Sequence, residues 1–278
     1  MPDGSRDQLV CLEEVNRTCR VLENQEMRLH PDDAVSTKLL IQELSRKGTL
    51  IYYKDKQDSA RINSRFPEDA YVLCIQTSFQ LDAFRRLGNG FIGIDATHNT
   101  TQYQDLLLFT IIARDCWGHG VPVAWMLSSN ATTETITFFV KWVRDASPEV
   151  RPTVIMTDRD QAQIAALEIA YPQSRIFLCT WHVLRTIQSH FITTQFQALW
   201  EKIKSWVITE DLAKFHKIWE EISTDTSVPR SIVDYLATEW LPVVHMWSKI
   251  LRKNRSIFEE GNTNMLIEAY VFHLSEDD

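Results

Sequence analysis

Two aspartates stand directly after short apolar runs and are the first candidates for chemistry. Asp95 follows residues 91–94, and Asp158 follows residues 152–157. An ionised carboxylate buried in a sheet costs several kcal/mol unless a cationic partner meets it. Two parallel strands that end side by side would bring both carboxylates close together, and a divalent cation would neutralise them. Oxygen ligands of this kind suit magnesium or manganese.

A third acid is available near the end of the sequence. Glu268 lies in a predicted helix that begins around Asn262 and carries apolar residues at helical spacing. Alternatives stay open for the first two acids. Asp95 is also an ordinary turn residue, because such side chains bond to their own backbone. Asp160 would share a side with Asp158 if that strand continued, but Asp158 comes first after the apolar run and is preferred.

The elements that must position these acids follow from periodicity and caps. Asp32 and Asp33 begin a helix that ends at Arg46, and Thr77 caps a helix over 78–87. The other predicted elements, in order, are strands at 50–53, 70–75, 91–95, 106–113 and 121–127, a helix from 132, a strand at 152–158, a helix at 161–170 and a strand at 175–179. From residue 91 onward the order is βββαβαβ, a meander followed by crossovers. This is the order of an RNase H-like sheet, so the predicted fold class is α/β, a mixed sheet flanked by helices.

Residues 183–260 differ in character from the rest of the sequence. They show long helical periodicity and contain five of the nine tryptophans. We therefore predict an all-helical insertion before the helix of the third acid. The predicted regions are an N-terminal accessory region at 1–69, with a partly disordered start, a first part of the core at 70–182, the insertion at 183–260, and a return to the core at 261–278.

Composition limits the possible classes of protein. The chain has 278 residues and a formal net charge of −8, which counts against binding nucleic acid by bulk charge alone. The acidic excess lies in 91–182 and 261–278, as expected for carboxylates that bind a metal ion. Five irregularly spaced cysteines without a CxxC pair argue against a disulfide scaffold or a zinc finger. No apolar segment approaches a membrane span or a signal peptide, which predicts an intracellular protein.

Three sequence blocks together resemble the transposase domain of Mutator-like elements. They are residues 94–100 with Tyr103, residues 156–160, and residues 262–268. A fourth block, residues 179–182, is similar to the Cys/His pair that follows the fifth strand in that family. The resemblance covers most of residues 70–270. It implies an RNase H-like core with a catalytic and metal-binding triad of Asp95, Asp158 and Glu268.

The resemblance also implies a chemistry and partners. Two Mg²⁺ or Mn²⁺ ions would support phosphodiester hydrolysis and strand transfer at transposon ends, with DNA as the partner, a homo-oligomer on DNA and a nuclear location. Cys179, Trp181 and His182 would lie beside the active site. Cys179 and His182 could also be half of a zinc site, but two ligands alone cannot fill a tetrahedral zinc site. The densest basic cluster could hold phosphates, although such runs are more often solvated helix faces; its members are Lys249, Arg252, Lys253 and Arg255.

The resemblance is incomplete at both ends of the sequence. The zinc-binding segments common in the family are missing, and the Glu268 helix ends in an acidic tail at 275–278, so the chain looks truncated. This motivates an alternative, a truncated or domesticated transposase that binds DNA or regulates without catalysis. A cellular nuclease with the same core is a third and weaker possibility.

Overall fold

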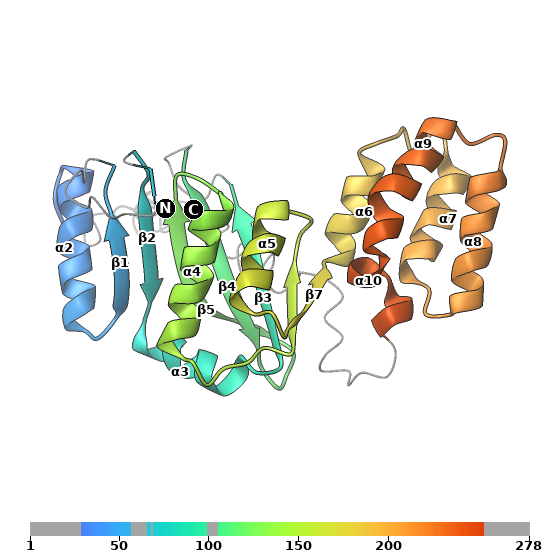
Figure 1. Ribbon diagram of the computed structural model, residues 1–278. Helices are drawn as coiled ribbons and strands as arrows, with labels where there is room; N and C mark the ends of the chain where they lie inside the picture. Colours follow the sequence, from blue (N-terminus) through green and yellow to red (C-terminus); the bar gives the residue numbers. More distant parts are fainter. Residues whose placement is uncertain (1–28, 57–65, 68, 99–104, 253–278) are drawn as a thin grey trace, which may run out of the picture.

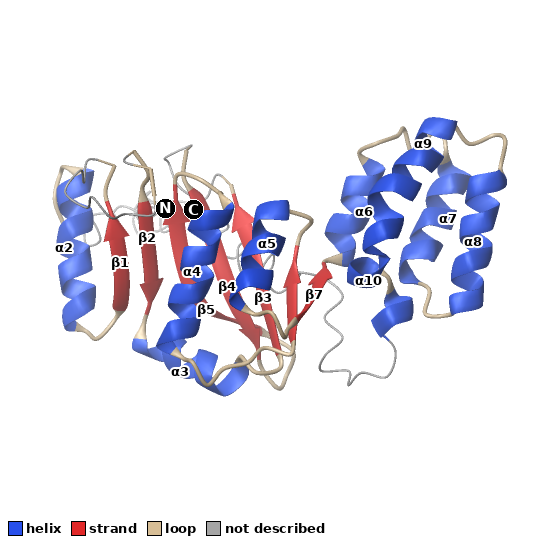
Figure 2. Cartoon of the chain, in the orientation of Figure 1, coloured by secondary structure: helices blue, strands red, loops and turns tan. Residues whose placement is uncertain are grey.

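The computed structural model describes residues 29–56, 66–67, 69–98 and 105–252. Within them, one mixed sheet of seven strands is followed by a group of helices (Figures 1 and 2). The strands are β1 (Leu50–Lys54), β2 (Val72–Gln76), β3 (Phe91–Thr97), β4 (Leu107–Arg114), β5 (Gly120–Ser128), β6 (Val154–Thr157) and β7 (Arg175–Leu178). The predicted α/β class with a mixed sheet and flanking helices is confirmed.

The spatial order of the strands is β1-β2-β5-β4-β3-β6-β7. From β1 to β3 in this spatial order, each strand pairs antiparallel with the next. β3, β6 and β7 run parallel to one another. β3 therefore lies at the junction between the antiparallel meander and the parallel strands. β1 comes from the region assigned before residue 70, yet it pairs along its whole length with β2.

Capping residues begin the helices that cover the sheet. The side chain of Asp32 accepts a hydrogen bond at the start of α2 (Asp33–Arg46), and Thr77 and Gln80 form a capping box on α3 (Ser78–Leu87). Thr132 caps α4 (Thr133–Ala146), and Asp160 caps α5 (Gln161–Ala170). Both α4 and α5 lie across the same face of the sheet (Figure 1).

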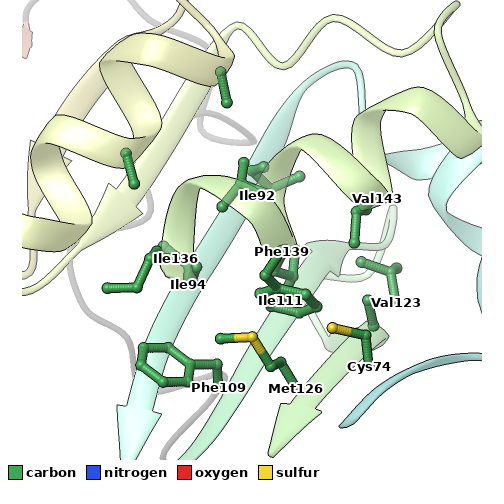
Figure 3. Close-up of a cluster of buried hydrophobic side chains, with 14 of the residues drawn as sticks. Cys74, Ile92, Ile94, Phe109, Ile111, Val123, Met126, Ile136, Phe139 and Val143 are labelled. Carbon is green, nitrogen blue, oxygen red and sulfur yellow. The ribbon is translucent and has the colours of Figure 1, made fainter. Parts of the chain in front are cut away.

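The main hydrophobic core fills the space between this face of the sheet and α4. Ile92, Ile94, Phe109 and Ile111 on the strands pack with Phe139 of α4 (Figure 3). These strand positions alternate with residues that point to the opposite face, as the pleat requires. Burial of this set therefore fixes which face of β3 carries Asp95.

The helical part forms a second core built around tryptophan. Its helices are α6 (Thr180–Gln188), α7 (Gln197–Ile208), α8 (Leu212–Thr224), α9 (Arg230–Tyr235) and α10 (Val244–Trp247), with a π-helix at Leu236–Trp240 and 3-10 turns at Leu241–Val243 and Lys249–Arg252. The ring of Trp206 lies 4.8 Å from that of Trp247 and 5.2 Å from that of Phe215, measured between centroids. In the described ranges, the helices after β7 begin at Thr180 and extend to Arg252.

The helix changes its type at Leu241-Pro242. The Leu241 amide donates to the carbonyl of Leu236, five residues earlier, and a 3-10 turn follows. Proline lacks an amide hydrogen and disturbs the regular helical ladder, which accounts for this irregular path.

None of the helices in the described ranges is long and apolar enough to cross a membrane.

Candidate active site

Asp95 lies in the middle of the sheet, on the face opposite the main core. Ile92 and Ile94 point into the core, so Asp95 points the other way. It is only 9% exposed. Its direct neighbour on β4 is Thr110, which is completely buried. The structure therefore places a carboxylate at a buried position of a central strand, and Asp95 is a strand residue rather than a turn residue.

Asp158 directly follows β6, the parallel neighbour of β3. The register pairs Phe91 with Val154 and Gly93 with Met156. Two residues further along each chain, this register reaches Asp95 and Asp158. Adjacent strands lie about 4.8 Å apart. Extended in this way, the register favours neighbouring positions for the first two predicted acids, one within β3 and one directly after β6.

The main hydrogen-bond partner of Asp158 is Gln163, in the first turn of α5. Its Nε2 donates to Asp158 Oδ1 at 3.0 Å, and its Oε1 accepts from the Thr157 hydroxyl at 3.2 Å. Its backbone amide donates to Asp160 Oδ1 at 2.7 Å. Asp160 therefore serves as the cap of α5. Gln163 was not among the predicted site residues, although its place three residues after a capping aspartate is a recognisable signal.

Burial raises the pKa of Asp158 to about 6, and the negative charge of Asp160 contributes in the same direction. Hydrogen bonds from the backbone of Asp158 and from the Thr157 side chain oppose the shift. The ionised carboxylate is thus held in surroundings that penalise its charge. Groups of this kind concentrate at functional sites, because a cationic ligand or a proton relieves the penalty.

Cys179 directly follows β7, as Asp158 directly follows β6. The register pairs Met156 with Phe177 and Thr157 with Leu178, so Asp158 is level with Cys179. The Cys179 amide donates to the carbonyl of Thr157 at 2.9 Å, and its side chain is fully buried. Cys179 also immediately precedes α6. The end of β7 therefore places this predicted accessory residue level with Asp158.

Trp181 and His182 follow in the first turn of α6. Trp181 is 41% exposed, and its ring packs edge-on against that of His182 at 4.8 Å. The guanidinium of Arg185 lies 4.8 Å from the centre of the Trp181 ring. An exposed aromatic ring with a cation over it is a surface suited to stacking on a planar group.

Arg159 connects the Asp158 loop to the helical part. One of its guanidinium nitrogens, Nη2, donates to the backbone carbonyl of Glu239 at 2.9 Å and to the Glu239 carboxylate at 2.7 Å. The same guanidinium lies 4.5 Å from the centre of the Trp240 ring. Both partners belong to the π-helix. Arg159 was not among the predicted site residues, and only its place next to Asp158 could have suggested it.

Several predicted residues lie outside the described ranges. These are Glu268 of the triad and Lys253 and Arg255 of the basic cluster; Lys249 and Arg252 form the 3-10 turn at the end of the last described range. Across the described ranges, no three His, Cys, Asp or Glu side chains come together as a metal site. The two aspartates thus supply at most part of a ligand set.

Comparison with known proteins gives one family match. The family model described as MULE transposase domain matches residues 91–186, from the start of β3 into α6. The matched range contains Asp95, Asp158 and the three accessory residues, and it ends within α6, before the other helices of the helical part and before Glu268. A search of the curated proteins finds no match. The family match supports a transposase-related function of the Mutator-like type.

Proposed function

We propose that this protein is a divalent-metal-dependent DNA transposase of the DDE type, with an RNase H-like core. The substrate would be DNA, namely the terminal repeats of a transposon and the target. The reactions would be hydrolysis of a phosphodiester and transfer of the freed strand. The observation that carries the proposal is the parallel pairing of β3, which contains Asp95, with β6, which Asp158 directly follows; both acids lie inside the range matched by the transposase family model.

The two aspartates fit a hard divalent cation. Both offer carboxylate oxygens, which Mg²⁺ and Mn²⁺ prefer. Burial penalises the charge of Asp158, and a cation at this place would offset the penalty. In the proposal, Glu268 is the third ligand. Two bound cations would supply charge stabilisation on the attacking and leaving oxygens of the phosphodiester.

The remaining residues have positioning roles in this proposal. Gln163 holds the Asp158 carboxylate through its side-chain amide, and Asp160 fixes the start of the helix that carries Gln163. Cys179, Trp181 and His182 border the site at the end of β7, where Trp181 would contact DNA. The basic cluster from Lys249 to Arg255 would bind phosphates, and the protein would act in the nucleus as a homo-oligomer on DNA.

Mn²⁺ binding to the purified full chain tests the proposal without knowledge of the DNA sequence. Calorimetry is run on the wild type, Asp158→Ala, Glu268→Gln and a matched control, Asp145→Asn, in which an exposed carboxylate of α4 is removed. We expect saturable binding in the wild type and the control. Binding should be lost in Asp158→Ala and weakened in Glu268→Gln. Absence of binding in the wild type would refute the metal-dependent mechanism.

Cleavage assays separate the proposal from its main alternative. Mn²⁺-dependent cutting of DNA that contains a transposon end, abolished by Asp95→Ala, is expected of an active transposase. DNA binding without cleavage would instead support a truncated or domesticated protein with a regulatory role. Equal cutting of DNA that lacks any such end would indicate a general nuclease.

A further inference from the structure

The hydroxyl of Thr110 is a buried polar group that the candidate site does not yet explain. Thr110 is completely buried, and its Oγ1 has no hydrogen-bond partner among the described residues. Buried hydroxyl groups are nearly always hydrogen-bonded, so an exception needs a reason. A valine would fill the same space without this polar atom.

The position of Thr110 relates it to Asp95. The two residues are direct cross-strand neighbours on β4 and β3. The flanking residues Phe109 and Ile111 point into the main core, so Thr110 points to the opposite face, which is the face of Asp95. Directly opposed residues on one face of an antiparallel pair have β-carbons about 5 Å apart. The hydroxyl is therefore next to the carboxylate without a direct hydrogen bond to it.

This separation suits an indirect contact. Two polar groups that are neighbours without a hydrogen bond between them can be bridged by a water molecule or a ligand. Carboxylates that bind a metal ion are themselves held by outer hydrogen bonds, which orient the ligands and tune the site. Gln163 provides such a bond to Asp158. The corresponding group beside Asp95 is the Thr110 hydroxyl.

We propose that Thr110 is a positioning residue whose hydroxyl hydrogen-bonds to the oxygen ligands of a divalent cation held at Asp95. This inference rests on the proposed function and adds a residue to it. The hydroxyl can both donate to a carboxylate oxygen and accept from a water molecule, whereas a valine at this place can do neither. Its value to the protein would then lie in metal affinity rather than in folding.

The test compares Thr110→Val and Thr110→Ser with the wild type. Mn²⁺ affinity is measured by calorimetry on the full chain, and stability is measured by urea unfolding in the presence of EDTA. We expect Thr110→Val to bind Mn²⁺ about tenfold more weakly or worse. Thr110→Ser should stay within about twofold of the wild type. In EDTA, Thr110→Val should be at least as stable as the wild type, because it loses an unsatisfied buried hydroxyl.

The outcomes separate this inference from the proposed function. Wild-type binding that is lost in Asp158→Ala but unchanged in Thr110→Val would overturn the role of Thr110 alone. No binding in the wild type would overturn both. Equal losses of metal affinity in the valine and serine variants would also contradict the inference, because serine keeps the hydroxyl. If Thr110→Val does not fold, the comparison of Thr110→Ala with Thr110→Ser decides in the same way.

Discussion

Replacement of Asp158 by asparagine should make the metal-free protein more stable at neutral pH. The folded structure raises the pKa of Asp158 from 3.8 to about 6. A shift of about two units corresponds to roughly 3 kcal/mol at 1.36 kcal/mol per unit. Because the pKa is raised, the penalty is fully present above pH 6 and disappears as the pH falls towards 4. Asparagine carries no charge and keeps an oxygen that can accept the hydrogen bond from Gln163.

The assay is urea unfolding of the wild type and Asp158→Asn in EDTA from pH 4.5 to pH 7.5. We expect the variant to be about 1–3 kcal/mol more stable at pH 7.5, with a difference that shrinks steadily as the pH falls through 6. Comparison at each pH cancels the other titrating groups. Mn²⁺ at about 100 times its dissociation constant should then stabilise the wild type by about 2.7 kcal/mol, and the variant far less.

Two results would refute this reasoning. A variant that is less stable than the wild type at pH 7.5 would show that the ionised carboxylate contributes to the fold instead of opposing it. A stability difference that does not change between pH 7.5 and pH 4.5 would show that the pKa of Asp158 is not raised. Asp160→Asn provides a control, because asparagine also caps helices well, and it should lower the pKa of Asp158 by removing a neighbouring charge.

Two further predictions concern the surroundings of the site. Arg159→Ala should lower the free energy of unfolding by about 2–3 kcal/mol, because it removes charge-assisted hydrogen bonds to Glu239 and the contact with the Trp240 ring. A double-mutant cycle with Glu239→Gln isolates the interaction between the two side chains. Additive effects of the two substitutions on stability would contradict the importance of this interaction. Gly88→Ala should lower the free energy of unfolding by about 1–3 kcal/mol, because the new methyl group would lie 2.7 Å from the Phe84 carbonyl oxygen and from a Val150 methyl carbon. Stability is measured by thermal unfolding, and an unchanged stability would show that this end of α3 adjusts to the methyl group without strain.

Local sequence signals predicted most elements well because local physics decides them. The helix over 78–87, with Thr77 as its cap and Gly88 as its end, is present with the same bounds. The helix at 161–170 is also present, and Asp160 caps it. In each case a capping side chain and apolar periodicity act within one or two turns. The end of β7 differs by one residue, because Cys179 precedes α6 instead of ending the strand.

The arrangement of the sheet depends on contacts that no local pattern carries. Sequence order does not reveal that β2 pairs with β5, or that β1 adds a strand beyond it. Asp95 and Asp158 were chosen from their places after apolar runs, but only the pairing of β3 with β6 brings their strands together. Arg159 acts through partners that become neighbours only on folding, such as Glu239, 80 residues away. The place of Glu268 stays a prediction, because it lies outside the described ranges.

The position of β3 between the two halves of the sheet also bears on the order in which the protein folds. β3, β4 and β5 are joined by short connections and pair antiparallel, so this meander closes small loops. The partnership of β3 with β6 must wait for α4, because a parallel neighbour requires a crossover. Longer loops close more slowly, so Asp95 should be fixed in its strand before Asp158 arrives. Pulse-labelled hydrogen exchange that protects β6 before β4 would contradict this order. The two aspartates would then meet only late in folding, when most of the surrounding core already exists, and intermediates would be unable to capture the metal ion.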